Sequence, residues 1–255
     1  MSVKLYTMTC GWLGMSLGAM LEGETGRIQI PVPVYLIDHP KGRVLFDSGL
    51  HIQAQTDPEA RLGWLMKAFT VQYRQNEDVA ARLRLMDIDA GGQGIRYLVN
   101  SHLHFDHAGG NEAIPNAQWV LQKREWEAAS DPDLSRIHGL HDKDYDHGHD
   151  RLTVDGEHDL FGDGRVVCIP TFGHTPGHQS LLVRTDDGEV LLTGDACYLR
   201  RSLENMQLPK HRHSAEEMLD SLRAIRAFQN RGARIIFGHD PDQWADHPGT
   251  PSLLI

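Results

Sequence analysis

Three histidines and one aspartate lie within six positions of the sequence, directly after a short apolar segment. They are His102, His104, Asp106 and His107, and the apolar segment covers residues 96–100. Neutral imidazole and ionised carboxylate are the ligands that divalent zinc or iron prefers where no thiolate is present. Alternate residues of an extended segment point to the same side, so His102 and His104 can hold one ion, and the chain then turns toward a neighbouring point. A lone loop histidine is usually solvated, but this spacing predicts two adjacent metal ions.

Three further ligand-type side chains each follow an apolar segment. The segments cover residues 166–169, 190–192 and 234–237, and the side chains that follow them are His174, Asp195 and His239. Sheet proteins place active sites where polar side chains follow strand ends. Each of these signals is weak alone, and together with the first cluster they predict one shared site.

Composition and charge exclude several classes of function. The chain has 255 residues and a formal net charge of −10 at pH 7. Phosphate binding requires a basic surface, so the sequence argues against nucleic acid and anionic membrane partners. No apolar run approaches the ~18 residues of a membrane span, and the first residues lack the pattern of a secretory signal. The three widely spaced cysteines, Cys10, Cys168 and Cys197, predict free thiols and a reducing, cytoplasmic compartment.

Strand-like and helix-like patterns alternate along the whole chain. Short apolar runs predict strands over residues 34–37, 43–46, 96–100, 117–121, 166–169, 180–183, 190–192 and 234–237. Amphipathic spacing predicts helices over residues 77–86 and 123–129. A third helix begins at Ser214, where Glu217 is expected to complete a capping box. The pattern predicts a single α/β domain over residues 1–255 with two sheets.

A patch rich in histidine and aspartate covers residues 141–150. It can bind adventitious metal, but no apolar strand presents these side chains. We therefore expect a solvated surface loop.

The motifs HxHxDH, GHTPGH, GDA and GHD together resemble the metallo-β-lactamase superfamily over nearly the whole chain. This resemblance implies an αββα sandwich of two mixed β-sheets flanked by helices, with a dinuclear site at the sheet edges. It also implies which ligands belong together. His102, His104 and His174 would hold one ion, Asp106, His107 and His239 the other, and Asp195 would bridge them. Zinc is the default metal, and iron, cobalt or manganese also suit nitrogen and oxygen ligands.

Within that superfamily the chain looks most like the N-acyl-homoserine lactonases, which quench bacterial quorum sensing. The matching stretches cover residues 101–111, 173–181 and 191–198. Tyr198 stands three positions after the bridging aspartate, as in those lactonases. One departure is Ser48, where the family more often has threonine, and this change is conservative.

The resemblance implies hydrolysis of a lactone by a hydroxide held between two metal ions. Tyr198 would donate a hydrogen bond to the developing oxyanion or to the substrate amide, and Asp106 would pass a proton to the leaving alkoxide. An apolar, methionine-rich region including Met20, Trp64 and Phe69 would bind the acyl chain. The same residues equally suit core packing or a homodimer interface.

These motifs are also compatible with other functions. The chain can be a hydrolase of the same superfamily acting on another lactone, ester or thioester, or a persulfide dioxygenase with a single iron. A metal-binding regulator without turnover is also conceivable, although a catalytic site, unlike a sensor, must keep a coordination position open for water. His178, Asp47 and Cys197 lie near the motifs and are expected to support the ligands or pack in the core, not to act on substrate.

Overall fold

Two β-sheets form the centre of the computed structural model, which describes residues 2–247 and 249–254. The larger, eight-stranded sheet has the order β13-β1-β2-β3-β5-β6-β7, with β4 paired to β1. The second, five-stranded sheet has the order β12-β11-β10-β9-β8. The strands of the larger sheet are β1 (Lys4–Ser16), β2 (Arg27–His39), β3 (Gly42–Phe46), β4 (Thr70–Gln72), β5 (Tyr97–Val99), β6 (Gln118–Gln122), β7 (Arg151–Val154) and β13 (Ser252–Leu253). Those of the smaller sheet are β8 (His158–Asp159), β9 (Val166–Pro170), β10 (Gln179–Thr185), β11 (Gly188–Leu192) and β12 (Arg234–Ile236).

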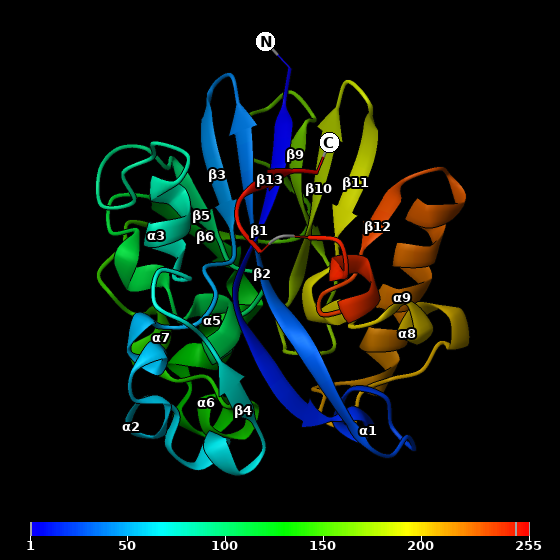
Figure 1. Ribbon diagram of the computed structural model, residues 1–255. Coiled ribbons are helices and arrows are strands. Elements are labelled where there is room, and N and C mark those ends of the chain that lie inside the picture. Colours follow the sequence, from blue (N-terminus) through cyan, green and yellow to red (C-terminus); the bar gives the residue numbers. More distant parts are fainter. Residues whose placement is uncertain (1, 248, 255) are drawn as a thin grey trace.

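Helices cover the two outer faces of this pair of sheets, as Figure 1 shows. Helices α3, α5 and α7 lie beside the larger sheet, and α8 and α9 lie beside the smaller one. The α-helices are α1 (Leu17–Met20), α2 (Pro58–Leu62), α3 (Val79–Arg84), α4 (Phe105–Ala108), α5 (Lys123–Ser130), α6 (Pro132–His138), α7 (Asp142–Tyr145), α8 (Arg200–Asn205) and α9 (Ala215–Asn230). Short 3₁₀ helices are η1 (Ile52–Gln55), η2 (Gly63–Lys67), η3 (Asn111–Ala113), η4 (Gly194–Ala196) and η5 (Pro241–Trp244). The predicted αββα sandwich is confirmed.

Alternation along the strands explains the layers. In β2, Tyr35 and Ile37 pack between the two sheets, whereas Val34 and Leu36 face the helices of the larger sheet. In β11, Val190 and Leu192 likewise face the other sheet, and Leu191 faces α9. Successive strand side chains point to opposite faces, so strands that are apolar throughout must be covered on both faces.

Both sheets are mixed, and their strand directions bring the site loops to one end. Strands β3, β5 and β6 are parallel, and so are β11 and β12, whereas β10 runs antiparallel to both β9 and β11. The carboxyl ends of β9, β11 and β12 therefore lie at the same edge of the smaller sheet. The backbone N–H of Gln179 donates to the carbonyl oxygen of Ser101 at 2.8 Å, which joins this edge to the loop after β5.

The predicted elements are present, although several begin or end at residues other than those expected. The hairpin between residues 34–37 and 43–46 is β2 and β3, and the helix predicted over residues 77–86 is α3, which covers only Val79–Arg84. All three cysteines are free and buried. No helix within residues 2–247 and 249–254 is both long and apolar enough to cross a membrane.

The patch at residues 141–150 differs from the expected solvated loop. It contains α7, in which Asp144 is only 2% exposed and pairs with Arg61 of α2. Tyr145 is also buried and packs against Trp119. The prediction of a surface loop was wrong for these two residues, because it judged Asp144 without its partner from a distant helix.

Helix α9 covers the smaller sheet, and the sequence predicts a capping box at its first turn. Ser214 Oγ accepts the backbone N–H of Glu217, as predicted. The Glu217 carboxylate, however, pairs with Arg124 of α5 at 2.9 Å instead of returning to the Ser214 backbone. The first half of the capping box is present, and the second half is replaced by a contact between two helices.

We expect Ser214→Ala to lower the free energy of unfolding by about 1 kcal/mol, because one N–H at the start of α9 loses its acceptor. Urea denaturation of the metal-free protein measures this difference. Ser214→Asp supplies an equivalent acceptor and should retain the stability of the original protein. Equal loss in both variants would contradict the capping role.

Candidate metal centre

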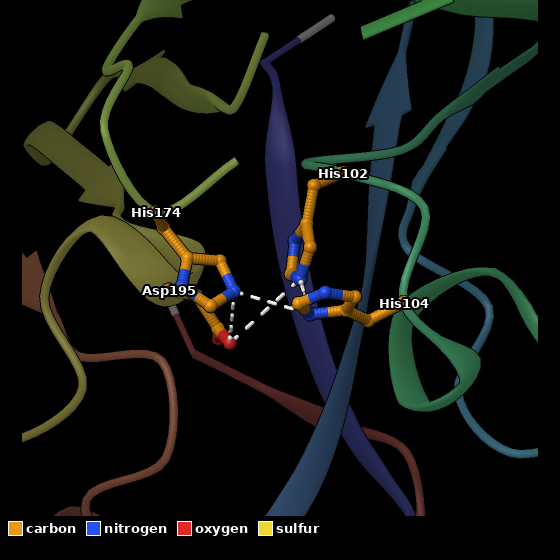
Figure 2. Close-up of side chains that lie close together, drawn as sticks. All are labelled: His102, His104, His174 and Asp195. Atoms are coloured by element: carbon orange, nitrogen blue, oxygen red, sulfur yellow. Dashed lines mark hydrogen bonds and ion pairs between the residues drawn. The ribbon is translucent and has the colours of Figure 1, made fainter. Parts of the chain in front are cut away.

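Four buried or nearly buried side chains converge on one point at the end of the sandwich. They are His102, His104, His174 and Asp195, whose nearest ligand atoms all lie within 4.8 Å of one another. His104 Nδ1 lies 2.8 Å from His102 Nε2 and 3.1 Å from His174 Nε2. Figure 2 shows His102 and His104 approaching from one side and His174 and Asp195 from the other. We call these four side chains the first cluster.

A second cluster lies directly beside the first. It consists of Asp106, His107 and His239, all buried, with ligand atoms again within 4.8 Å. His107 Nε2 and His239 Nε2 are 3.3 Å apart. Among residues 2–247 and 249–254 these are the two groups able to hold a metal ion, and neither includes a side chain of the patch at residues 141–150.

The carboxylate of Asp195 lies between the two clusters. Its Oδ2 is 3.3 Å from His174 Nε2 in the first cluster, and its Oδ1 is 2.9 Å from His239 Nε2 in the second. Asp195 is 3% exposed, and within the described residues Oδ1 accepts no hydrogen bond of good geometry. A buried carboxylate oxygen without a hydrogen-bond donor is costly unless a cation lies close to it.

Each of the five histidines has its other ring nitrogen bound to a neighbour outside the clusters. His104 Nε2–H donates to the carbonyl oxygen of His138, and His239 Nδ1–H donates to that of Pro31, both at 2.8 Å. The remaining outer contacts are His107 Nδ1 to Asp47 Oδ2 at 2.8 Å, His102 Nδ1 to Ser101 Oγ at 3.0 Å and His174 Nδ1 to Tyr198 Oη at 3.3 Å.

These outer contacts set the tautomers. A carbonyl or carboxylate oxygen can only accept, so the nitrogen facing it carries the proton. In neutral His104, His107 and His239 the inner nitrogen therefore presents a lone pair to the cluster centre. Imidazoles held in this way by outer acceptors are typical of metal ligands. The donor set thus fits divalent cations.

Burial and charge divide the histidines into two groups. Burial, reinforced by the neighbouring imidazoles, holds the pKa of His102 and His174 well below its usual value and also lowers the pKa of His104. Burial acts in the same direction on His107 and His239, but the nearby carboxylates, chiefly that of Asp195, outweigh it and raise their pKa. In the metal-free chain the first cluster therefore disfavours protons, and the second retains them.

The loops that carry the side chains of the two clusters are held by buried residues. Asn100 Oδ1 accepts from Asn111 Nδ2 at 2.8 Å and from Trp119 Nε1 at 2.7 Å, which holds both ends of the HxHxDH loop. His178 Nε2 accepts the backbone N–H of Asp195 at 3.0 Å. Gly194 precedes this aspartate with a φ of +51°, and a Cβ there would lie 2.8 Å from His178 Nε2. His178 thus contacts the loop of Asp195, and neither cluster includes it.

Tyr198 lies at the border of the two clusters. Besides its hydroxyl contact with His174, its ring stacks on that of His239 with centroids 5.8 Å apart. Burial raises the pKa of Tyr198 well above its usual value, and the carboxylates of Asp195 and Asp106 act in the same direction. The hydroxyl therefore keeps its proton at neutral pH and can donate it in a hydrogen bond.

The three residues predicted to bind an acyl chain have different surroundings. Met20 is fully buried, and the partly buried Phe69 packs its ring against Phe105 at a centroid distance of 5.4 Å. Both belong to the apolar cluster that Tyr198 also contacts. Trp64 is 63% exposed. Phe69 thus reaches the helix that carries Asp106, whereas Met20 lies within the core.

Sequence reasoning missed Glu125, a buried carboxylate that contacts both loops of the first cluster. It accepts hydrogen bonds from the backbone of Leu103 and from Thr175 and Gly177. Its neighbours in the sequence are Lys123, Arg124 and Glu127, so the segment resembles an exposed, charged helix. The one available signal is Ala128, which lies three positions further along the same helical face and is also buried.

Comparison with known proteins agrees with this geometry. Residues 27–239 match the profile of the metallo-beta-lactamase superfamily. The chain is 34% identical to the N-acyl homoserine lactonase AttM of Azorhizobium caulinodans, covering 98% of this chain and 97% of the relative. It is 30% identical to the N-acyl homoserine lactonase AiiA of Bacillus thuringiensis subsp. kurstaki, covering 94% of each chain.

A solved structure has the same fold. An N-acyl homoserine lactone hydrolase with N-hexanoyl-L-homoserine bound at its catalytic metal centre superimposes with a TM-score of 0.85 and 27% identity, covering 96% of each chain. The resemblance inferred from the motifs is therefore confirmed. The profile match, the relatives and the fold together show that this chain belongs to the metallo-beta-lactamase superfamily, as a hydrolase similar to the N-acyl homoserine lactonases.

Proposed function

We propose that this protein opens the lactone ring of N-acyl-homoserine lactones with the help of two divalent metal ions. The observation that carries this proposal is the pair of buried His/Asp clusters joined by Asp195, with the hydroxyl of Tyr198 beside them. The names of the relatives AttM and AiiA support the choice of substrate. A second complete cluster favours two ions over the single iron of a persulfide dioxygenase.

The proposed ligands follow the two clusters. His102, His104 and His174 would hold one ion, Asp106, His107 and His239 the other, and Asp195 would bind both. When bound, the two ions would supply Lewis-acid activation and a hydroxide formed from water near neutral pH. The donors are nitrogen and oxygen only, so we propose zinc, with iron, cobalt or manganese as alternatives.

The chain's own groups would complete the reaction. Water adds to the lactone carbonyl, the ring C–O bond breaks, and the departing alkoxide takes up a proton to give the open hydroxy acid. The neutral Tyr198 hydroxyl would donate a hydrogen bond to the oxyanion or to the substrate amide. Asp106 would pass the proton to the alkoxide, and its side chain is 11% exposed, the most open of the carboxylates at the site.

An acyl chain would bind beside the apolar cluster that Tyr198 contacts. Phe69 is the strongest of the predicted residues for this role, because it is partly exposed and packs against Phe105, next to Asp106. Trp64 would extend the apolar surface outward, and Met20 would support it from the core. A single domain, a homodimer and a cytoplasmic location remain predictions of the sequence.

The direct test of this function is hydrolysis of a panel of acyl-homoserine lactones by metal-replete protein, followed as acid release. We expect ring opening by the wild-type chain and two ions in each molecule. Asp195→Ala should lose turnover together with metal, because both clusters lose their shared ligand. Full activity of this variant with two bound ions would contradict the bridging role, and lactones left intact by the wild-type protein would refute the proposed activity.

Replacement of Tyr198 tests the proposed hydrogen bond. Tyr198→Phe should retain both ions and slow hydrolysis by ~10- to 1000-fold, because the oxyanion loses one donor. Tyr73→Phe is a matched control, since its hydroxyl donates to the carbonyl oxygen of Leu50 in the same apolar cluster. An unchanged rate in Tyr198→Phe would reduce this tyrosine to a packing residue.

Metal binding to the two clusters should differ in its dependence on pH. The raised pKa of His107 and His239 means that these imidazoles release their protons at a higher pH than a free imidazole does, so metal must compete with protons for them. Affinity of the second cluster should therefore rise with pH, by about tenfold per pH unit for each proton displaced. Affinity of the first cluster should change little in this range, because its histidines are already neutral.

Calorimetric titration between about pH 6 and pH 8 measures both slopes. The variant His104→Ala leaves only the second cluster intact, and His239→Ala leaves the histidines of the first. Equal slopes in the two variants would show that the carboxylates do not control proton binding in this way.

A further inference from the structure

Glu125 is a buried carboxylate that has no role in the proposed reaction. It lies in the first turn of α5, is 1% exposed, and no contact joins it to either metal cluster. Burial raises its pKa to about 7, although the hydrogen bonds from Thr175, Gly177 and Leu103 oppose this effect. Burying a carboxylate is unfavourable, and the hydrogen bonds that Glu125 accepts from the two loops offset part of that cost.

Its two oxygens bind two different loops. Oε1 accepts the backbone N–H of Leu103 at 3.1 Å, and this residue lies between His102 and His104. Oε2 accepts from Thr175 Oγ at 2.7 Å and from the backbone N–H of Gly177 at 2.9 Å. Thr175 directly follows His174 in the sequence. One carboxylate therefore contacts both segments that supply the three histidines of the first cluster.

Gly177 shows how closely the second loop approaches α5. A Cβ on this glycine would lie 2.0 Å from the backbone nitrogen of Glu125 and 2.6 Å from its Cα. No side chain fits there without displacing the helix. The loop after β9 thus packs directly against the backbone at the start of α5, and Glu125 binds it in that position.

The second cluster is supported by other groups. His107 is held by Asp47, and His239 by the carbonyl oxygen of Pro31. Glu125 contacts neither of these histidines. Asp47 does contact Ser101, next to His102, so it reaches the first cluster from the other side.

We propose that Glu125 is a positioning residue that sets the spacing of the three histidines in the first cluster and thereby its affinity for metal. The inference rests on the proposed metal centre and not on the choice of substrate. Side chains that orient metal ligands through an intervening group typically change metal affinity by ~10- to 100-fold when replaced. The effect should be confined to the first cluster.

Glu125→Gln is the decisive variant, because it keeps the size of the side chain. An amide has one acceptor oxygen and one NH₂ group, so in either orientation an N–H of Leu103 or Gly177 faces a donor. We expect cobalt titration to show ~10- to 100-fold weaker binding at the first cluster and unchanged binding at the second. The two clusters are separated by placing Glu125→Gln in the His239→Ala and His104→Ala backgrounds.

Glu127→Gln is the matched control, since it makes the same change on an exposed residue of the same helix, where the carboxylate pairs with Lys123. Its cobalt affinities should equal those of the unmodified chain. Thr175→Val removes one donor to Glu125 without altering the carboxylate. It should weaken the first cluster less, and have little further effect once Glu125→Gln is present.

Unchanged affinity of the first cluster in Glu125→Gln would overturn the proposal. Equal loss at both clusters would also overturn it, because that result describes a general contribution to folding. If Glu125→Gln does not fold, the cobalt affinities of the two clusters in Thr175→Val test the proposal instead: weaker binding at the first cluster alone supports it, and unchanged binding there overturns it. A wild-type chain that binds two ions but opens no lactone would refute the proposed activity and leave this measurement valid.

Discussion

The site depends on the placement of one carboxylate among five imidazoles. Asp195 is buried, and its two oxygens face different clusters, at 3.3 Å from His174 and 2.9 Å from His239. Without cations, the inner nitrogens of the neutral first-cluster histidines lie close together beside this carboxylate, in a buried region where only His107 and His239 favour a proton. Such an arrangement is unfavourable in a low dielectric unless positive charge lies between the groups. The fold must therefore hold these side chains in place by interactions outside the two clusters.

The outer hydrogen bonds supply that restraint, and they come from distant parts of the chain. His239 is held by the carbonyl oxygen of Pro31, 208 positions away, and His104 by that of His138. Carbonyl oxygens of the backbone cannot change their role with pH, so these contacts fix the tautomer as well as the orientation. The geometry of the site is consequently a property of the packed sandwich, and correct packing of both sheets is required before the side chains of the two clusters can meet.

The sequence was sufficient to predict the groups that could carry chemistry and the layers that hold them. Spacing alone indicated His102, His104, Asp106 and His107, because side-chain direction alternates along an extended segment, and apolar runs located most strands. The sequence could not predict contacts between helices that lie far apart along the chain. Asp144 was expected to be solvated because its partner Arg61 lies 83 positions away in the sequence. Glu125 was missed because its sequence neighbours are charged and the loops that it contacts lie elsewhere in the chain. Local patterns report which residue types are present, whereas burial of a charge depends on a partner that only the fold provides.

Two buried carboxylates outside the clusters, Glu125 and Asp47, bind the segments that carry the histidines. Glu125 contacts the loops of His102, His104 and His174, whereas Asp47 binds His107 directly and the backbone of Ser101. The clusters meet at Asp195, and its backbone N–H is bound by His178, which belongs to neither of them. Asp47 also reaches the loop of His102 through Ser101, whereas the contacts of Glu125 lie in the loops of the first cluster, so a change at Glu125 can alter the affinity of that cluster without displacing the second. Asp195 is the carboxylate that faces both clusters, so its replacement, unlike that of Glu125, should affect both.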